Sequence, residues 1–115
     1  MRYLCTIYGE ESQWSDQTPE QMGAVMAAYN AFGDEARAAG VMVGGEGLEP
    51  TSSATTVRVR DGERVLSDGP FAETKEQLGG YFLIDVDDLD AAIDIAARMP
   101  TVYQGSIEVR PLANG

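Results

Sequence analysis

The chain has 115 residues, of which 43% are apolar, and its 19 acidic and eight basic residues give a formal charge of -11. This length provides one hydrophobic core of ordinary size, so a single domain over residues 1–115 is predicted. The negative charge disfavours direct binding to nucleic acid and to anionic membrane surfaces, because both are themselves densely negative.

Histidine is absent, and cysteine occurs once, at Cys5. Without histidine the chain lacks the commonest general base and metal ligand, which excludes Ser-His-Asp and Cys-His triads and the usual zinc sites. Cys5 lies in an apolar segment and is interpreted as a buried, unreactive thiol. We expect no metal and no cofactor. A cytoplasmic location is also expected, since no signal-peptide pattern and no apolar run of about 18 residues is found.

The first half of the chain predicts a strand, a long helix and a second strand. The strand covers Tyr3–Tyr8, and polar loops are expected at 10–17 and, later, at 49–55. Thr18-Pro19-Glu20-Gln21 forms a capping box, and Gly40 suits the left-handed position that ends the helix. The apolar stripe of this helix is interpreted as core and consists of Met22, Val25, Met26, Tyr29, Phe32 and Ala36.

The glycines at 44, 45 and 47 interrupt the second strand, which begins at Val41–Val43, and they indicate a bulge. A hairpin follows, because Thr56–Arg60 and Arg64–Leu66 flank the turn pair Asp61-Gly62. Tyr81–Val86 is almost continuously apolar, as expected of a central strand. The last elements are a helix capped by Asp87 or Asp88, with its stripe at Leu89, Ala92, Ile93 and Ala96, and an edge strand at Ser106–Arg110.

This order of elements predicts an α+β, ferredoxin-like fold, in which two helices cover one face of an antiparallel sheet and a β-hairpin is added. The other sheet face then has no cover within the chain. Leu4 and Tyr8, together with either Tyr81 and Leu83 or Phe82 and Ile84, should point to that face. Burying these apolar side chains requires a second subunit, so a homodimer with sheet-on-sheet contact is predicted.

The segment Ser67–Tyr81, which begins with Ser67-Asp68-Gly69-Pro70-Phe71, resembles the DGPF branch of the YCII-related family. The resemblance extends over most of the chain and includes Tyr3-Leu4, Ile7–Gly9, Ala39–Val41, Gly44–Leu48 and Ile107–Pro111. It implies a dimeric α/β-barrel architecture and an association with sigma factors of the extracytoplasmic-function type. The founding YCII branch carries a histidine and aspartate pair proposed to act in catalysis. That mechanism does not carry over to a chain without histidine.

Asp68 and Lys75 are the candidate catalytic residues. Together with Glu73 they fall within one short loop between two strands, where a carboxylate beside an ammonium can transfer a proton or hold a polar ligand. Asp68 would act as acid or base, and Lys75 would stabilise developing negative charge. The structural alternatives are a tight turn made by Asp68-Gly69-Pro70 and a simple salt bridge.

Four further residues are candidates for ligand binding: Glu73, Phe71, Tyr81 and Glu46. Phe71 and Tyr81 would line an apolar pocket, although aromatic residues in such positions more often belong to the core. Glu46 lies in the glycine-rich stretch and is either a pocket carboxylate or a solvated residue at a bulge. That stretch lacks the strand-to-helix context and the lysine of phosphate-binding loops, so a nucleotide site is not expected.

Two classes of function remain open from the sequence. The first is a small-molecule-binding domain that acts as a cofactor-independent enzyme, using carboxylate acid–base chemistry on a small metabolite. The second is a non-catalytic binding or regulatory module associated with a sigma factor. Both require a small-molecule or protein partner and neither requires DNA contact.

Overall fold

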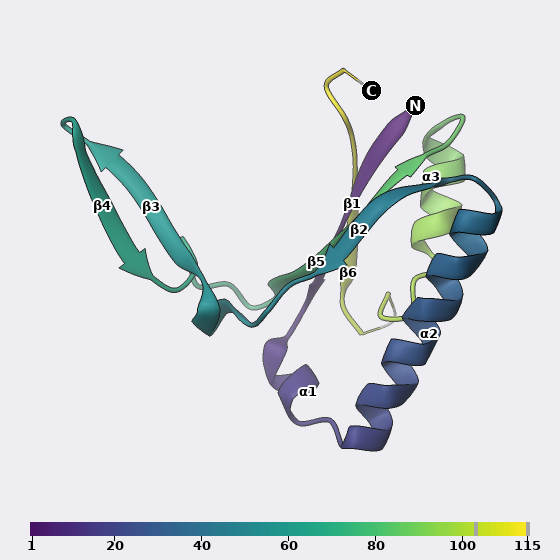
Figure 1. Ribbon diagram of the computed structural model, residues 1–115, viewed down its shortest axis with the longest axis horizontal. Coiled ribbons are helices and arrows are strands. Elements are labelled where there is room, and N and C mark those ends of the chain that lie inside the picture. The colour runs from purple at the N-terminus through teal and green to yellow at the C-terminus, as the bar shows by residue number, and fades with distance from the viewer. Residues whose placement is uncertain (103, 115) are drawn as a thin grey trace.

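The computed structural model describes residues 1–102 and 104–114 and has an α+β architecture (Figure 1). Its centre is a four-stranded antiparallel sheet with the strand order β2-β5-β1-β6. The strands are β1 (Arg2–Gly9), β2 (Met42–Gly47), β5 (Gln77–Asp85) and β6 (Ser106–Pro111). This order is consistent with the ferredoxin-like prediction, and it confirms that β5 is central and β6 is an edge strand.

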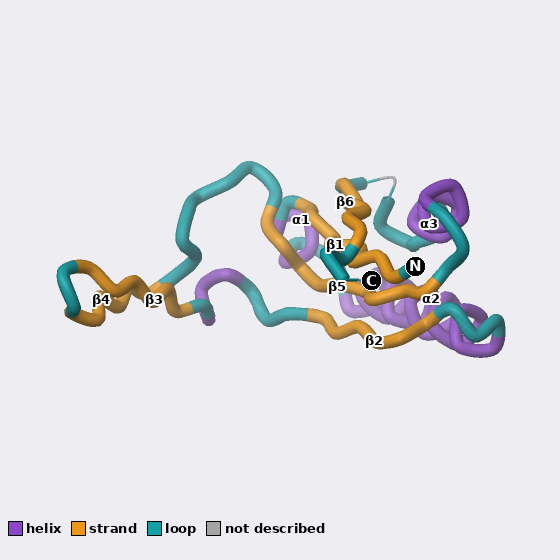
Figure 2. The backbone as a smooth tube through the Cα atoms, turned by 90° about the horizontal axis from the view of Figure 1, so that it is seen from above, coloured by secondary structure: helices purple, strands orange, loops and turns teal. Residues whose placement is uncertain are grey.

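Two helices, α2 (Pro19–Ala38) and α3 (Leu89–Ala96), lie on the same face of this sheet (Figure 2). The predicted capping box begins α2, because Thr18 Oγ1 accepts from the Gln21 amide at 3.1 Å and Gln21 Oε1 accepts from the Thr18 amide at 2.9 Å. Gly40 follows the helix with a φ of 75°, as predicted. Asp88 caps α3 through the amide of Ala91 at 2.9 Å.

Both segments expected to be plain loops contain short helical turns, so that prediction was wrong. Helix α1 (Glu11–Ser15) lies in the first segment, and the 3-10 turn η1 (Thr51–Ser53) lies in the second. The Glu11 carboxylate accepts hydrogen bonds from the amide and the hydroxyl of Thr51, both at 2.8 Å. Gln77 Oε1 accepts from the Glu11 amide at 2.9 Å. Contacts with residues distant in the sequence hold α1 in place, and no local capping pattern predicts this helix.

Strand register decides which side chains face the helices. Cys5 is opposite Phe82 and Tyr3 is opposite Ile84, and these residues pack into the core beneath the helices. The ring of Phe82 contacts Phe32 of α2 with a centroid separation of 5.3 Å. Because neighbouring residues in a strand point to opposite faces, the alternate set lies on the helix-free face. That set includes Leu4, Thr6, Tyr8, Tyr81 and Leu83, which resolves the open choice in favour of Tyr81 with Leu83.

Cys5 is fully buried in this core. Burial raises the pKa of its thiol to about 11, because the apolar surroundings disfavour the thiolate. At neutral pH the group is therefore protonated and not nucleophilic, in agreement with the interpretation of Cys5 as unreactive.

The predicted hairpin is formed by β3 (Thr55–Arg60) and β4 (Glu63–Asp68). Asp61 and Gly62 both have positive φ, as a two-residue hairpin turn requires. The hairpin forms a separate two-stranded sheet and projects away from the central sheet (Figure 1). We call residues 55–68 the arm. Its projection gives the chain a radius of gyration of 16.0 Å, compared with about 13 Å for a compact domain of this length.

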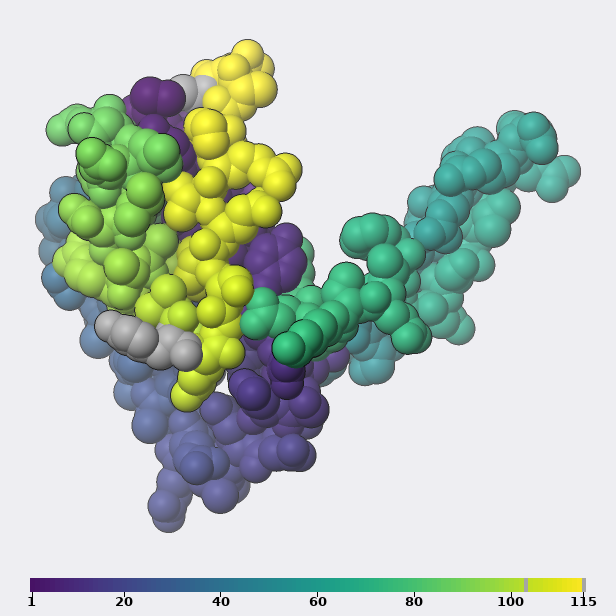
Figure 3. Space-filling model, turned by 180° about the vertical axis from the view of Figure 1, so that it is seen from behind, coloured from purple at the N-terminus to yellow at the C-terminus, as the bar shows by residue number. Residues whose placement is uncertain are grey.

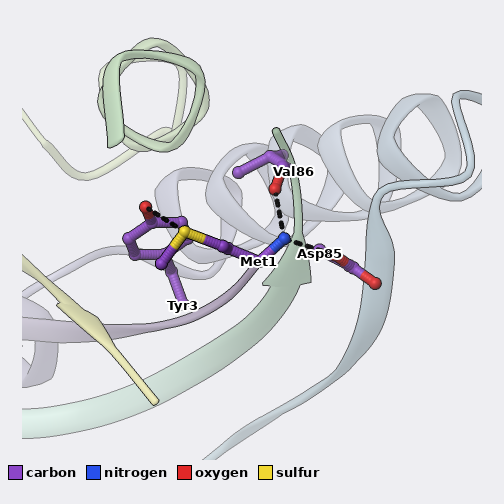
Figure 4. Close-up of polar contacts among 4 residues, drawn as sticks. All are labelled: Met1, Tyr3, Asp85 and Val86. Carbon is purple, nitrogen blue, oxygen red and sulfur yellow. Dashed lines mark hydrogen bonds and ion pairs between the residues drawn. The ribbon is translucent and has the colours of Figure 1, made fainter. Parts of the chain in front are cut away.

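Met1 ties the start of β1 to the end of β5 (Figure 4). Its ammonium group forms an ion pair with Asp85 at 3.2 Å and donates to the carbonyl of Val86 at 2.7 Å.

Within the described part of the chain, no helix combines the length and the apolar character needed to cross a membrane.

Candidate functional site

A cleft of about 420 Å³ lies between α2 and the helix-facing side of β2 and β5. Strands β2 and β5 supply its floor, α2 supplies one wall, and Trp14 of α1 closes one end. The cleft is mainly apolar and has a few polar groups at its margin. This composition is typical of sites that bind small organic molecules.

The floor is made of glycine backbone, including Gly45, Gly79 and Gly80. A Cβ atom at Gly80 would lie 2.9 Å from the Glu46 carbonyl oxygen, so only glycine fits between the two strands there. A Cβ atom at Gly79 would lie 2.5 Å from the indole ring of Trp14. The absence of side chains therefore allows the indole to lie directly on strand β5 and lets strand backbone line the cleft.

The α2 wall consists of residues that recur at helical spacing: Met22, Val25, Met26, Tyr29, Asn30, Gly33 and Arg37. Met22 is 51% exposed and Met26 is 64% exposed, so the prediction that both are core residues was wrong. The first half of α2 lies beyond the end of the sheet, opposite α1 (Figure 1). With no strand behind them, the two methionines face the cleft.

Arg37 is the charged side chain at the far end of this wall from Met22. It forms an ion pair with Asp34 at 3.2 Å. A Cβ atom at Gly33 would lie 3.0 Å from the Arg37 guanidinium, so the arginine lies across the helix at the point where a side chain is absent. A guanidinium in this position can bind a carboxylate or another planar anion.

Tyr29 and Thr101 form a hydrogen-bonded hydroxyl pair at the back of the cleft. Burial raises the pKa of the Tyr29 phenol, and hydrogen bonding with Thr101 opposes this shift only in part. The phenol is therefore protonated at neutral pH. It can serve as a hydrogen-bond donor or acceptor but does not serve as a base.

Glu46 and Tyr81 line the cleft, and the register limits how they do so. They are opposite each other, between the helix-facing pairs Gly45 with Phe82 and Gly47 with Gly80. Their side chains therefore point to the helix-free face, and only their backbone reaches the cleft. The structure thus brings these two predicted ligand-binding residues together, but their side chains meet on the opposite side of the sheet.

The other four candidates lie outside the cleft. Asp68, Phe71, Glu73 and Lys75 are all exposed, with Phe71 at 78%, and none lines the cleft. Among the described residues, no hydrogen bond or ion pair joins Asp68, Glu73 and Lys75. The reason is that β4 belongs to the arm, so the loop after it does not start from an edge of the central sheet.

Backbone contacts fix the start of this loop. Gly69 has a φ of 93°, its amide donates to the Ala54 carbonyl at 2.7 Å, and its carbonyl accepts from the Thr56 hydroxyl at 2.8 Å. The Arg58 guanidinium donates to the Phe71 carbonyl at 3.3 Å. These contacts agree with the structural alternative for Asp68-Gly69-Pro70, which is a tight turn that ends the arm.

Sequence reasoning missed Trp14 and Arg37. Trp14 lies in the segment expected to be a loop. It is the only tryptophan of the chain, and this was the one feature of the sequence that could have marked it as a site residue.

A second cavity of about 550 Å³ lies on the other side of Trp14, and Leu48, Pro50 and Leu78 contribute to its lining. Trp14, Met22 and Gly79 line both cavities. Neither cavity contains a metal-binding group of three or more His, Cys, Asp or Glu side chains within residues 1–102 and 104–114.

Comparison with known proteins gives a family for this chain. The model of the YCII-related domain matches residues 1–114. The chain is also 42% identical over 115 aligned residues to an uncharacterized protein, R00369, of Rhizobium meliloti (strain 1021). That alignment covers 98% of this chain and 93% of the relative. On this match over nearly the whole length, the chain belongs to the YCII-related family.

Proposed function

We propose that this protein binds a small, mainly apolar molecule with an anionic group in the cleft between α2 and the glycine floor. The observation that carries this proposal is the cleft itself, whose floor of Gly45, Gly79 and Gly80 is kept free of side chains. Substitution at Gly79 or Gly80 would place a Cβ atom within 3 Å of a neighbouring atom. Glycine at these two positions therefore lets Trp14 and strand β2 approach the backbone of β5 closely.

The ends of the cleft define the class of ligand. Met22 and Trp14 form an apolar end, and the guanidinium of Arg37, which is paired with Asp34, lies at the other end. The Arg37 guanidinium lies over Gly33, and Gly33 follows Met22 by 11 residues on α2, or about 16 Å along the helix axis. A ligand with an aromatic or aliphatic body and a carboxylate or sulfonate would place its body against the indole and its charge toward the guanidinium.

Trp14 provides a direct assay because it is the only tryptophan. Selective excitation of the indole should transfer energy from Trp14 to 8-anilinonaphthalene-1-sulfonate, an aromatic sulfonate, when this dye occupies the cleft. Aromatic and aliphatic carboxylates should displace the dye, and their neutral amides should displace it less well. Dye binding with no energy transfer from Trp14, or no discrimination between acids and amides, would contradict the proposal.

The contribution of Arg37 is tested with the substitution Arg37→Met, which keeps the aliphatic stem and removes the charge. We expect about a tenfold loss of affinity for the dye, because a charge-assisted hydrogen bond contributes about 1.5–3 kcal/mol when it is sheltered and less when it is exposed. Arg98→Met is the matched control. Arg98 is also exposed and also forms an ion pair at 3.2 Å, with Glu35, but it does not line the cleft. Equal losses in the two variants would contradict the role of Arg37.

A homodimer that buries the helix-free sheet face is part of the same proposal, and it corresponds to the dimeric α/β barrel implied by the resemblance to the DGPF branch. Leu4, Tyr8 and Leu83 form an apolar centre on this face, and the edge strands add the charged side chains of Glu46, Glu108 and Arg110. Thr6 Oγ1, at its centre, is buried and has no hydrogen-bond partner among the described residues. Buried hydroxyl groups are normally paired, and a second subunit can supply the missing partner.

Catalysis by Asp68 and Lys75 stays a prediction, since both lie outside the cleft of their own chain. If Asp68 takes part in ligand binding or turnover, Asp68→Asn should abolish that response at an unchanged melting temperature, and Lys75→Met should do the same. If Asp68 only ends the arm, the substitution should lower the melting temperature slightly and leave ligand binding intact. Melting temperature and dye affinity measured on the same preparations separate these results. A regulatory link to an extracytoplasmic-function sigma factor rests on the resemblance alone and also stays a prediction.

A further inference from the structure

We propose that the arm clasps a second copy of this chain, and that the face of the arm carrying Val57, Val59 and Leu66 packs against it. This inference rests on the proposed sheet-face homodimer and adds a second contact region to it. Four features of the molecule support it, namely the placement of the arm, its exposed apolar side chains, the surface area of the chain and the distribution of charge.

The arm projects on the same side of the sheet as the helix-free face. Figures 1 and 2 both show α2 and α3 on one side of the central sheet and the arm on the other. In the space-filling view, the arm stands clear of the rest of the molecule except at its root (Figure 3). A second copy seated on the helix-free face would therefore lie beside the arm.

The arm has an apolar face that no described residue of its own chain covers. Val57 is opposite Leu66, and Val59 lies on the same side of the hairpin. These side chains are about 60% exposed. An isolated two-stranded hairpin is only marginally stable in water, and exposed apolar strands of this kind are normally protected by a partner. Val65, on the opposite face of the hairpin, lies among polar neighbours such as Arg58.

The surface area of the chain is too large for a compact monomer. Its accessible surface is 7854 Å², whereas a compact monomer of 12.3 kDa has about 6,100 Å². A standard interface buries about 800 Å² on each partner. The excess of about 1,750 Å² is larger than the area that one partner contributes to a standard interface.

The distribution of charge favours a second copy as the occupant. Residues 55–75 contain four of the eight basic residues and four of the 19 acidic residues, so this segment is neutral and the rest of the chain carries the whole charge of -11. Arg58, Arg60 and Arg64 form no ion pair among the described residues. A neutral arm with unpaired arginines can approach the acidic body of another copy without the repulsion that two bodies experience.

The test compares two matched substitutions by analytical ultracentrifugation of the full chain. Val57→Glu places a charge on the proposed contact face, and Val65→Glu places the same charge on the opposite face. Both positions lie in the arm, outside the core, so neither change should unfold the domain. We expect Val57→Glu to raise the dissociation constant of the dimer at least tenfold, because burying an unpaired charge is unfavourable, and Val65→Glu to change it less than threefold. An unchanged constant in both variants, or a change only in Val65→Glu, would overturn the inference.

Hydrogen exchange provides an independent readout. The arm amides should be protected in the wild-type dimer and should exchange much faster in a sheet-face variant, Leu83→Glu, that is monomeric. Equal exchange in the two proteins would show that the arm does not contact a second copy. Protection of the arm that appears only after another protein is added would also refute the inference. If Leu83→Glu dissociates the dimer and Val57→Glu does not, the proposed contact of the arm is wrong but the sheet-face dimer stands. If the wild-type protein is a monomer, the sheet-face dimer is wrong as well.

Discussion

Leu83→Glu is expected to convert the dimer into monomers at micromolar concentration. Leu83 lies opposite Leu4 on the helix-free face, in the central strand of the proposed interface. A carboxylate there would be buried against apolar side chains of the second subunit without a partner, which costs several kcal/mol and corresponds to at least a hundredfold increase in the dissociation constant. Light scattering measures the effect directly.

Leu89→Glu is the matched control for this experiment. Leu89 is an exposed leucine at the start of α3, and an acidic residue near a helix N-terminus is favourable. We expect this variant to stay dimeric and fully folded. Dissociation by both substitutions would indicate that added negative charge alone separates the subunits. Retention of the dimer by Leu83→Glu would show that the sheet face is not the interface.

Trp14→Ala is expected to weaken binding of 8-anilinonaphthalene-1-sulfonate at least tenfold. The indole lies on Gly79 and closes one end of the cleft, so its removal takes away an aromatic contact surface and opens the cleft to solvent. Calorimetric titration follows binding in the absence of tryptophan fluorescence. Trp14→Phe keeps an aromatic ring and should restore most of the affinity.

Phe71→Ala is the control for this second prediction. Phe71 is exposed and does not line the cleft, so dye affinity should be unchanged. If Trp14→Ala and Phe71→Ala weaken binding equally, the dye binds elsewhere. If Trp14→Phe binds as poorly as Trp14→Ala, the indole acts by a contact that a phenyl ring does not replace.

Local sequence patterns were sufficient for the elements they specify. The capping box at Thr18 and the glycine at 40 fixed the ends of α2, and Asp61-Gly62 fixed the hairpin turn, because each depends on backbone groups a few residues away. The apolar run around Phe82 identified a central strand. Element order was then enough to predict an α+β fold of ferredoxin-like type, because short connections leave few ways to arrange these elements.

The candidate site was predicted less well, since its parts meet only through tertiary contacts. The short loop after Asp68 was predicted to hold the candidate catalytic residues, but the hairpin pairs only with itself and carries this loop away from the cleft. Met22 and Met26 have the spacing of core residues, yet α2 extends past the sheet and leaves them on a cleft wall.

The sequence by itself determined the local elements, the buried state of Cys5 and the absence of histidine chemistry, because these depend on residue type and on neighbours along the chain. Only the tertiary structure decided which face of the sheet each side chain occupies. The register places Tyr81 and Leu83 away from the helices, and a single bulge or a shift by one residue would reverse this. It also decided the position of Trp14, which depends on hydrogen bonds from α1 to Thr51 and Gln77, residues more than 35 positions away in the sequence.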